Sequence, residues 1–242
     1  MQILLVSDLH YTLRQLDWVA SVAADYDLVV VAGDLLDIAS GVEPDAQIAV
    51  ALEYLARFAT KTAVIACSGN HDLNSRNELD ELSATWLTPA RASGVVVDGM
   101  RTETDDVLVT VCPWWDGPRT QDVIDAQLTV DSELVAGRQW VWVYHGPPDS
   151  SPTSWTGKRY YGDDALNRWI DRHRPDFVLC GHVHQAPFVD GGSWIDRTGS
   201  TVVLNPGRQR GPLPTYIELD TTAGLARWGS LEGVDEQTLA PA

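Results

Sequence analysis

The sequence LVVVAGDLLD (residues 28–37) joins five consecutive apolar residues to a glycine and an aspartate. Strands buried on only one face alternate apolar and polar residues, so this unbroken run is typical of a strand covered on both faces. Gly33 allows the chain to turn sharply where the run ends. Asp34 then follows at the carboxyl end of the predicted strand, which is where ligands bind in α/β proteins.

Similar apolar, β-branched runs recur along the chain and predict further strands. Several of them are continuous, and the same argument predicts that both of their faces are buried. The predicted strands are residues 3–6, 28–32, 63–67, 107–112, 140–144, 177–180, 201–204 and 215–219.

Helical patterns of apolar residues lie between several of these runs. Thr12 and Gln15 have the spacing of a capping box in front of the first pattern. Pro175 ends the last pattern, because proline cannot continue a helix. The expected helices are residues 13–23, 46–59, 78–93 and 166–173.

The order of these elements predicts a layered α/β fold with mixed sheets in a single domain over residues 1–232. The C-terminal part is rich in strands and turns, with a hairpin expected around TTAG at 221–224. Residues 113–137 and 146–165 contain Pro, Gly, Trp and Asp with little periodicity, and we expect loops over a site there. Residues 233–242 are expected to form a flexible tail.

Composition excludes several function classes. A formal net charge of −17 repels a polymeric phosphate backbone, which argues against extended nucleic acid as a partner. The first ten residues lack a basic segment, and no apolar run approaches the ~18 residues of a membrane span, so we expect neither a signal peptide nor a membrane helix. Three cysteines without a CxxC pair indicate reduced thiols and a cytoplasmic location.

Polar residues gather where the predicted strands end, and five of the six histidines lie there. Imidazole, carboxylate and amide groups form a nitrogen and oxygen donor set that suits Mn²⁺, Fe²⁺, Co²⁺, Ni²⁺ or Zn²⁺. Histidines two apart on an extended segment share one side and can reach two neighbouring ions. The sixth, His173, lies on a predicted helix face and is interpreted as structural. The polar segments are SDLH (7–10), GDLLD (33–37), GNHD (69–72), HGPP (145–148) and GHVH (181–184).

The ordered set D-x-H, G-D-x-x-D, G-N-H-D, H and G-H-x-H resembles the motifs of the calcineurin-like metallophosphoesterases. NPGR at 205–208 resembles the family's Asn-Pro-Gly-Ser segment, with Arg208 in place of the serine. HGPP is similar to a subset of the family that includes small cyclic-nucleotide phosphodiesterases. The resemblance implies a four-layer α/β/β/α sandwich of two mixed sheets flanked by helices, with two metal ions between its loops.

The resemblance also implies a role for each motif residue. Carried over by motif, the first metal would be bound by Asp8, His10 and His184, the second by Asn70, His145 and His182, and both by Asp34. His71 would act as general acid toward the leaving group and Asp37 would orient it. Substrate contacts are expected from Asn70 and from Arg208, although Arg208 departs from the serine of the family segment.

The implied activity is hydrolysis of small phosphoesters, as a phosphodiesterase or phosphatase, with a metal-bridging hydroxide attacking phosphorus. The ions would be two of Mn²⁺, Fe²⁺/Fe³⁺, Zn²⁺, Co²⁺ or Ni²⁺, and their positive charge would let an acidic protein bind phosphate. One alternative is a metal-dependent nuclease, against which the acidity counts. Another is a non-enzymatic binding scaffold with the same fold, which would be marked by missing ligands, and none is missing.

Several residues near these motifs allow two interpretations. Cys67 and Cys180 are either thiolate ligands or buried fillers, and the second is favoured because the ligand set is complete without them. Trp114 and Trp115 either stack on a base of the substrate or cap the core. Lys158 and Arg159, together with Arg208, either add positive charge to the site or are solvated surface charges.

Overall fold

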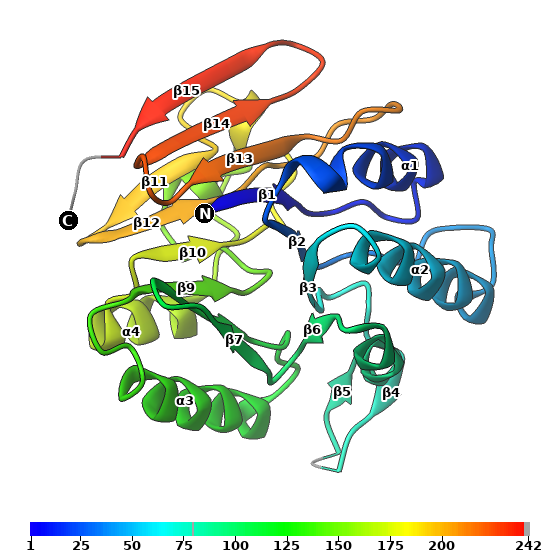
Figure 1. Cartoon of the computed structure of the whole chain (residues 1–242), viewed down its shortest axis with the longest axis horizontal. Coiled ribbons are helices and arrows are strands. Elements are labelled where there is room, and N and C mark those ends of the chain that lie inside the picture. The colour runs from blue at the N-terminus through cyan, green and yellow to red at the C-terminus, as the bar shows by residue number, and fades with distance from the viewer. Residues whose placement is uncertain (79, 240–242) are drawn as a thin grey trace.

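The unbroken apolar runs form the central strands of two mixed sheets (Figure 1). The computed structural model describes residues 1–78 and 80–239. In the larger sheet, four strands are parallel and three C-terminal strands continue it in antiparallel pairing. Its order is β15 (Val234–Thr238), β14 (Leu225–Gly229), β13 (Tyr216–Asp220), β1 (Gln2–Val6), β2 (Leu28–Ala32), β3 (Ala63–Cys67) and β6 (Val96–Val97).

The second sheet has four parallel strands in its centre and an antiparallel strand at each edge. Its order is β11 (Ile195–Thr198), β12 (Thr201–Leu204), β10 (Phe177–Leu179), β9 (Gln139–Val143), β8 (Val107–Val111) and β7 (Arg101–Glu103). All eight strands predicted from the apolar runs are present, and the hairpin expected around residues 221–224 joins β13 to β14.

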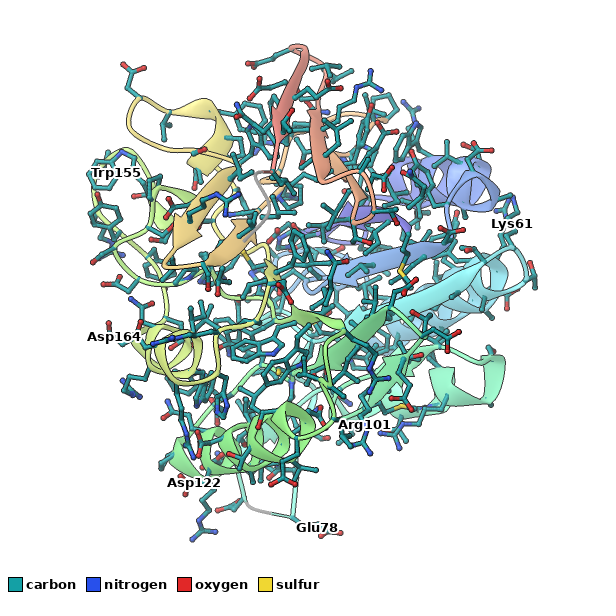
Figure 2. All side chains as sticks on the ribbon, turned by 60° about the vertical axis from the view of Figure 1, so that its left-hand side comes forward. Lys61, Glu78, Arg101, Asp122, Trp155 and Asp164 are labelled. Carbon is teal, nitrogen blue, oxygen red and sulfur yellow. The ribbon has the colours of Figure 1, made fainter. Side chains whose placement is uncertain are left out.

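The two sheets pack face to face, and helices cover their outer faces, so the predicted four-layer α/β/β/α sandwich is confirmed. On β2, Val30 and Ala32 lie in the core between the sheets, whereas Val29 and Val31 pack under helices. Figure 2 shows side chains filling the space between these layers. The helices are α1 (Leu13–Val22) and α2 (Pro44–Ala59) over the first sheet, and α3 (Pro118–Ser132) and α4 (Asp164–His173) over the second.

Residues 78–93 were predicted as one helix, but residues 80–93 are not an α-helix. They include the end of a short hairpin, β4 (Ser75–Arg76) with β5 (Leu82–Ser83), followed by the 3-10 helix η2 (Thr85–Ser93). Pro89 lies inside η2, and the Trp86 indole donates a hydrogen bond to the carbonyl of Asp72. These tertiary contacts outweigh the helical pattern. Three further 3-10 turns are η1 (Ala23–Asp25), η3 (Pro152–Ser154) and η4 (Ala186–Phe188).

Helix α3 lies inside the segment 113–137 that was predicted as loop, so that prediction is wrong for residues 118–132. Its buried face carries Thr120 and Asp131 beside Ile124 and Leu128, which weakens the apolar periodicity. Asp131 accepts hydrogen bonds from Arg101 and from Thr110 of the adjacent strands. The polar side chains on the buried face of α3 therefore find hydrogen-bond partners in distant parts of the chain.

The predicted capping box of α1 is also wrong. Thr12 occupies the N-cap position, but its side chain makes no capping hydrogen bond. The buried Gln15 amide turns away and donates to the carbonyls of Gln209, Gly211 and Leu213. It therefore connects α1 to the loop that follows the NPGR segment.

Within the predicted tail, residues 234–238 instead form β15, which pairs along its whole length with β14. All five of its residues are exposed, so the main-chain ladder is the contact that orders them. Leu239 is buried against the inter-sheet core, and Asp235 accepts a hydrogen bond from the Trp194 indole. The part of the tail prediction that covers residues 240–242 lies outside the described residues.

In the described part of the chain, no helix combines the length and the apolar character needed to cross a bilayer.

Candidate metal centre

The turns that follow β1 and β2 are connected to each other by main-chain hydrogen bonds. Asp8 donates to the carbonyl of Gly33, and His10 donates to the carbonyl of Asp34. Asp8, His10 and Asp34 all have positive φ angles, between 41° and 54°. Such backbone conformations cost of order 1 kcal/mol each for residues other than glycine, and they persist where the surrounding structure enforces them. The strained turns aim these three side chains at one point.

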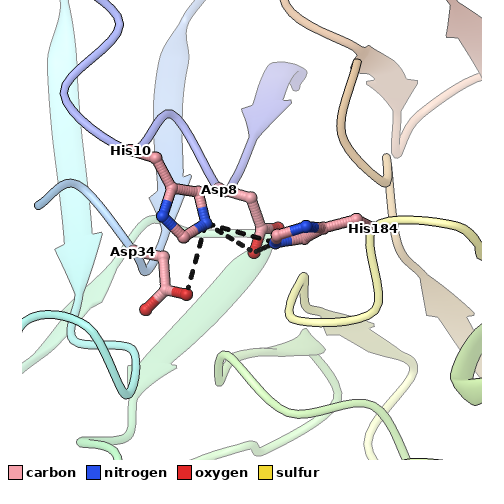
Figure 3. A group of neighbouring side chains, drawn as sticks. All are labelled: Asp8, His10, Asp34 and His184. Carbon is pink, nitrogen blue, oxygen red and sulfur yellow. Dashed lines mark hydrogen bonds and ion pairs between the residues drawn. The ribbon is translucent and has the colours of Figure 1, made fainter. Parts of the chain in front are cut away.

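Four of the predicted ligands form a close cluster, which is drawn in Figure 3. The Nε2 atom of His184 lies 3.1 Å from Oδ1 of Asp8 and 3.1 Å from Nε2 of His10. The Nε2 atom of His10 lies 3.6 Å from Oδ2 of Asp34. One donor atom from each of Asp8, His10, Asp34 and His184 lies within 4.8 Å of the other three, which is the arrangement that a cation site needs.

Asp34 also faces His145, a predicted ligand of the second ion. The Nδ1 atom of His145 lies 2.7 Å from the carbonyl of Ala32 and donates a hydrogen bond to it. This bond orients the ring and keeps the proton on Nδ1, so the neutral ring would present an unprotonated Nε2, the form that binds metals. Nε2 is buried, lies 3.3 Å from Oδ2 of Asp34 and has no hydrogen-bond partner in the described residues.

Asn70 and His182 lie next to this group. The His182 ring centroid is 5.2 Å from that of His145, and both Asn70 and His182 line one cavity. The Oδ1 atom of Asn70 is buried and has no hydrogen-bond partner within residues 1–78 and 80–239. A buried polar atom without a partner costs about 1–3 kcal/mol, so two such atoms on neighbouring predicted ligands need an explanation. A divalent cation would satisfy both, and the donor set therefore fits a metal.

The pKa values of the clustered side chains also indicate that a cation would stabilise the site. Burial by itself raises the pKa of Asp8, but a hydrogen bond from His184 and the charge of His145 hold it below its ordinary value. Burial lowers the pKa of His145, yet the nearby Asp34 carboxylate raises it to about 10. Burial lowers the pKa of His10 and of His182 to about 4 in each case. The two buried carboxylates of Asp8 and Asp34 are thus what raises the pKa of His145, and a bound cation would balance their charge instead.

His71 lies beside the cluster rather than in it. Its main-chain N–H donates to Oδ1 of Asp34 at 2.8 Å, and its ring is edge-on to His10 at 4.5 Å between centroids. The Nδ1 atom accepts a hydrogen bond from the N–H of Ile38 at 3.4 Å. Asp37 was predicted to orient His71, but its Oδ1 atom lies 4.0 Å from Nδ1 of His71, beyond hydrogen-bond distance. Oδ1 of Asp37 instead accepts a hydrogen bond from the main-chain N–H of Ala39.

Asp72 is a structural member of the site that the sequence analysis left without a role. It is fully buried and accepts hydrogen bonds from the main-chain N–H groups of Asp34, Leu36 and Gly69. Its carboxylate therefore holds the turns after β2 and β3 together. The sequence contained one indication of this role, because Asp72 belongs to the GNHD segment, in which Asn70 and His71 were already predicted site residues.

Asn205 has a similar role on the other sheet. Its amide donates to the carbonyls of Thr153 and Val183, and its carbonyl oxygen accepts from the N–H of Gly207. The neighbouring Arg208 donates its main-chain N–H to the carbonyl of His184. Through these bonds the NPGR segment supports the GHVH segment, which carries two predicted ligands.

The other candidates have clear positions. His173 packs edge-on against Trp140 and Trp142. Cys67 and Cys180 are fully buried among core residues, which fits the interpretation as fillers.

We expect Gly33→Ala to distort the site. Gly33 has φ of +85°, and a Cβ atom there would lie 2.4 Å from Nδ1 of His145. Gly94→Ala is the matched control, because its φ is +83° and nothing lies within 4 Å of its Cβ position. In metal-free protein, Gly33→Ala should lower the free energy of unfolding by about 3 kcal/mol and Gly94→Ala by about 1 kcal/mol. Denaturant titration measures both, and equal losses would show that the His145 contact has no effect.

Comparison with known proteins is consistent with this geometry. Residues 1–224 match the sequence model of the calcineurin-like phosphoesterase superfamily domain. The crystal structure of TT1561 of Thermus thermophilus is similar, with 16% identity, a TM-score of 0.59 and 98% of each chain covered. Purple acid phosphatase PPD1 from yellow lupin (Lupinus luteus) seeds is 12% identical with a TM-score of 0.58, over 99% of this chain and 54% of that one. At these identities the two structures show a shared fold. No curated protein sequence matches the chain.

Proposed function

Because the chain belongs to the calcineurin-like phosphoesterase superfamily, we propose that it hydrolyses small phosphoesters with the help of two divalent cations. One observation carries the proposal. Asp8, His10, Asp34 and His184 form one cluster of donors, His145 faces Asp34, and Asn70 and His182 line the cavity beside them. Asn70 Oδ1 and His145 Nε2 are buried with no hydrogen-bond partner in the described residues. Nε2 of His173 and Oδ1 of Asn167, outside the site, also lack a hydrogen-bond partner, so a missing bond alone does not identify a metal site. The proposal rests on the combination, because His145 Nε2 lies 3.3 Å from the Asp34 carboxylate, which belongs to the cluster of four donors.

The first cation would be held by Asp8, His10 and His184, and the second by Asn70, His145 and His182, with Asp34 between them. The assignment is supported by the position of Asp34, whose Oδ2 atom faces His10 at 3.6 Å and His145 at 3.3 Å. Two divalent cations at such a site supply Lewis acidity toward the phosphoryl group and lower the pKa of the water that serves as nucleophile.

His71 would deliver a proton to the leaving oxygen. Because Nδ1 accepts from the N–H of Ile38, the proton of the neutral ring resides on Nε2. The side chain is 22% exposed, so it is accessible to a substrate and is not locked in the core. Asp37 at 4.0 Å would stabilise the ring if it became charged, and in this structure the N–H of Ile38 determines the ring orientation.

Arg208 would bind the phosphoryl oxygens. Its guanidinium makes no hydrogen bond or ion pair within residues 1–78 and 80–239, and its charge is one of the causes that lower the pKa of His10. The chain has a formal charge of −17, and its overall field repels anions. A cationic side chain without an ion-pair partner would therefore help such a chain to bind a phosphate group. The same field favours a small substrate over a polymeric one.

A metal-removal experiment tests the proposal. Prolonged dialysis against a chelator should lower hydrolysis of bis(nitrophenyl) phosphate and nitrophenyl phosphate at least about 100-fold, and Mn²⁺ or another first-row cation should restore it. Elemental analysis before and after dialysis follows the metal content. Full hydrolysis by protein shown to be metal-free would contradict the proposal, as would the absence of any hydrolysis after reloading with each of the candidate ions.

A further inference from the structure

A cavity of about 460 Å³ lies directly beside the proposed metal centre. Asn70 and His182, which are proposed ligands of the second cation, line it. A volume of this size is within the range of sites that enclose a small organic ligand. Beyond the ligands, the residues that matter for its chemistry are Trp114, Trp115, Gln121, Tyr161 and Arg168.

Aromatic rings line this cavity, and each of them contacts a neighbouring side chain. Tyr161 lies nearly parallel to the His182 ring, at 5.1 Å and 19°. Trp114 lies 5.1 Å from His182 on one side and stacks on Tyr144 at 6.3 Å and 11°. The Trp115 indole donates to Asp163 at 2.7 Å. The partly buried rings of Trp114 and Trp115 present flat surfaces to a planar ligand with little loss of conformational entropy, whereas Tyr161 is 51% exposed and is oriented by its contact with His182.

Two polar side chains in the same cavity have no partner in the described chain. Gln121 is partly exposed and Arg168 is exposed. Neither the Gln121 amide nor the Arg168 guanidinium makes a hydrogen bond or ion pair with any residue in 1–78 or 80–239, so both groups are accessible to a ligand. Asp163 is different, since its carboxylate accepts from Trp115, Tyr144 and Ala165. The Arg168 guanidinium offers hydrogen-bond donors, and the Gln121 amide offers both donors and an acceptor. Together they suit a planar ligand whose edge carries both acceptors and donors. A nucleobase has such an edge, and a plain aryl group does not.

A second, smaller cavity of about 250 Å³ lies next to His71. His71, Asp37, Ile38 and Ile48 line it, and it shares no lining residue with the first cavity. The consecutive residues Asn70 and His71 therefore line different cavities. A group next to His71 would receive its proton, whereas a group next to Asn70 and His182 would not.

We propose that the substrate is a phosphodiester whose retained group is a nucleoside, with its base in the aromatic cavity and its leaving group beside His71. This inference rests on the proposed function and adds the substrate class to it. Water adds its oxygen to phosphorus, and the P–O bond to the leaving group breaks. The departing oxygen takes the proton from Nε2 of His71, and a proton of the attacking water replaces it. The products are a nucleoside monophosphate and an alcohol.

Two substrates with the same leaving group separate the roles of the cavities. The nitrophenyl ester of thymidine 5′-monophosphate retains a nucleoside, and methyl nitrophenyl phosphate retains only a methyl group. With Mn²⁺ present, wild-type protein should prefer the first in kcat/KM by at least about 10-fold. Gln121→Ala and Arg168→Ala should each lower kcat/KM about 10-fold for the nucleoside ester and leave the methyl ester almost unchanged.

Arg172→Ala is the matched control, because Arg172 lies one turn further along α4 and pairs with Asp125 outside the cavity. It should affect neither substrate. Equal turnover of the two esters by wild-type protein, or equal losses on both in the Gln121 and Arg168 variants, would overturn the assignment of the cavity.

A binding measurement keeps this inference separate from the proposed function. Equilibrium dialysis should show that thymidine 5′-monophosphate binds at least about 10-fold more tightly than ribose 5-phosphate, and that Gln121→Ala removes the difference. If neither ester is hydrolysed but this preference is present, the hydrolase proposal fails and the base site stands. If both esters are hydrolysed and the preference is missing, the base site fails alone.

Discussion

Asp34→Ala should lower kcat/KM by about 10⁴-fold, equivalent to about 5.5 kcal/mol of transition-state stabilisation, and should reduce the bound metal. Asp34 is 1% exposed, and its Oδ2 atom lies closer to His10 and His145, at 3.6 and 3.3 Å, than Oδ1 of Asp8 does, at 3.9 Å from each. Its Oδ1 atom also accepts from the N–H of His71 at 2.8 Å. Loss of the side chain therefore removes negative charge from both proposed metal positions and releases the turn that carries His71.

Two further variants separate charge from packing. Asp34→Asn keeps the shape and the hydrogen bond to His71 but removes the charge, so it should also lose metal and most of the activity. Cys180→Ala is the control for a buried substitution near the site, because the Cys180 thiol donates to the carbonyl of Leu204 and packs in the core. It should keep its metal and its activity. A Cys180 variant without metal, beside an Asp34 variant that retains both ions, would contradict the ligand assignment.

His71→Ala should act on the leaving group and not on metal binding. General acid catalysis contributes about 10²–10⁴-fold, and the contribution is largest where the departing oxygen is a poor leaving group. We expect about a 10³-fold loss of kcat/KM for an alkyl or ribosyl ester and about a 10-fold loss for a nitrophenyl ester, because nitrophenolate leaves without a proton. Metal content should equal that of the wild type.

The ratio of the two losses is the measurement that decides this role. His173→Ala is the matched histidine control, since His173 packs against Trp140 and Trp142, and it should change neither rate by more than about 2-fold. Equal losses on both esters together with a missing ion would make His71 a metal ligand and remove its role as proton donor.

The central strands could be predicted because their residues are buried on both faces. The run at 28–32 is apolar throughout, since Val29 and Val31 pack under helices while Val30 and Ala32 face the other sheet. Parallel strands of this kind end at one edge of a sheet, so the polar residues that follow them could be grouped into one site from the sequence. The structure brings together Asp8, His10, Asp34 and His184 as expected.

Other elements could not be predicted because their order comes from contacts with distant residues. The exposed strand β15 is paired with β14 by main-chain hydrogen bonds, to which its side-chain pattern contributes nothing. Helix α3 lacks a clear apolar periodicity because the polar residue Asp131 lies on its buried face. The hydrogen-bond partners of Asp131, Arg101 and Thr110, lie on the neighbouring strands. Gln15 has the spacing of a capping residue, but the carbonyls of a loop almost two hundred residues later compete for its amide.

The sequence by itself determined which residues stand at the strand ends and which donor types they offer, because apolar burial and side-chain chemistry are local properties. The tertiary structure alone decided how these side chains are aimed. Asp8 and Asp34 reach the cluster from backbone with positive φ, which is stable only because the neighbouring turns bond to each other and Asp72 holds them. The aromatic cavity beside Asn70 likewise exists only once Trp114, Tyr161 and Arg168 meet from separate segments. Such positions depend on the summed contacts of the whole chain, and no short stretch of sequence contains them.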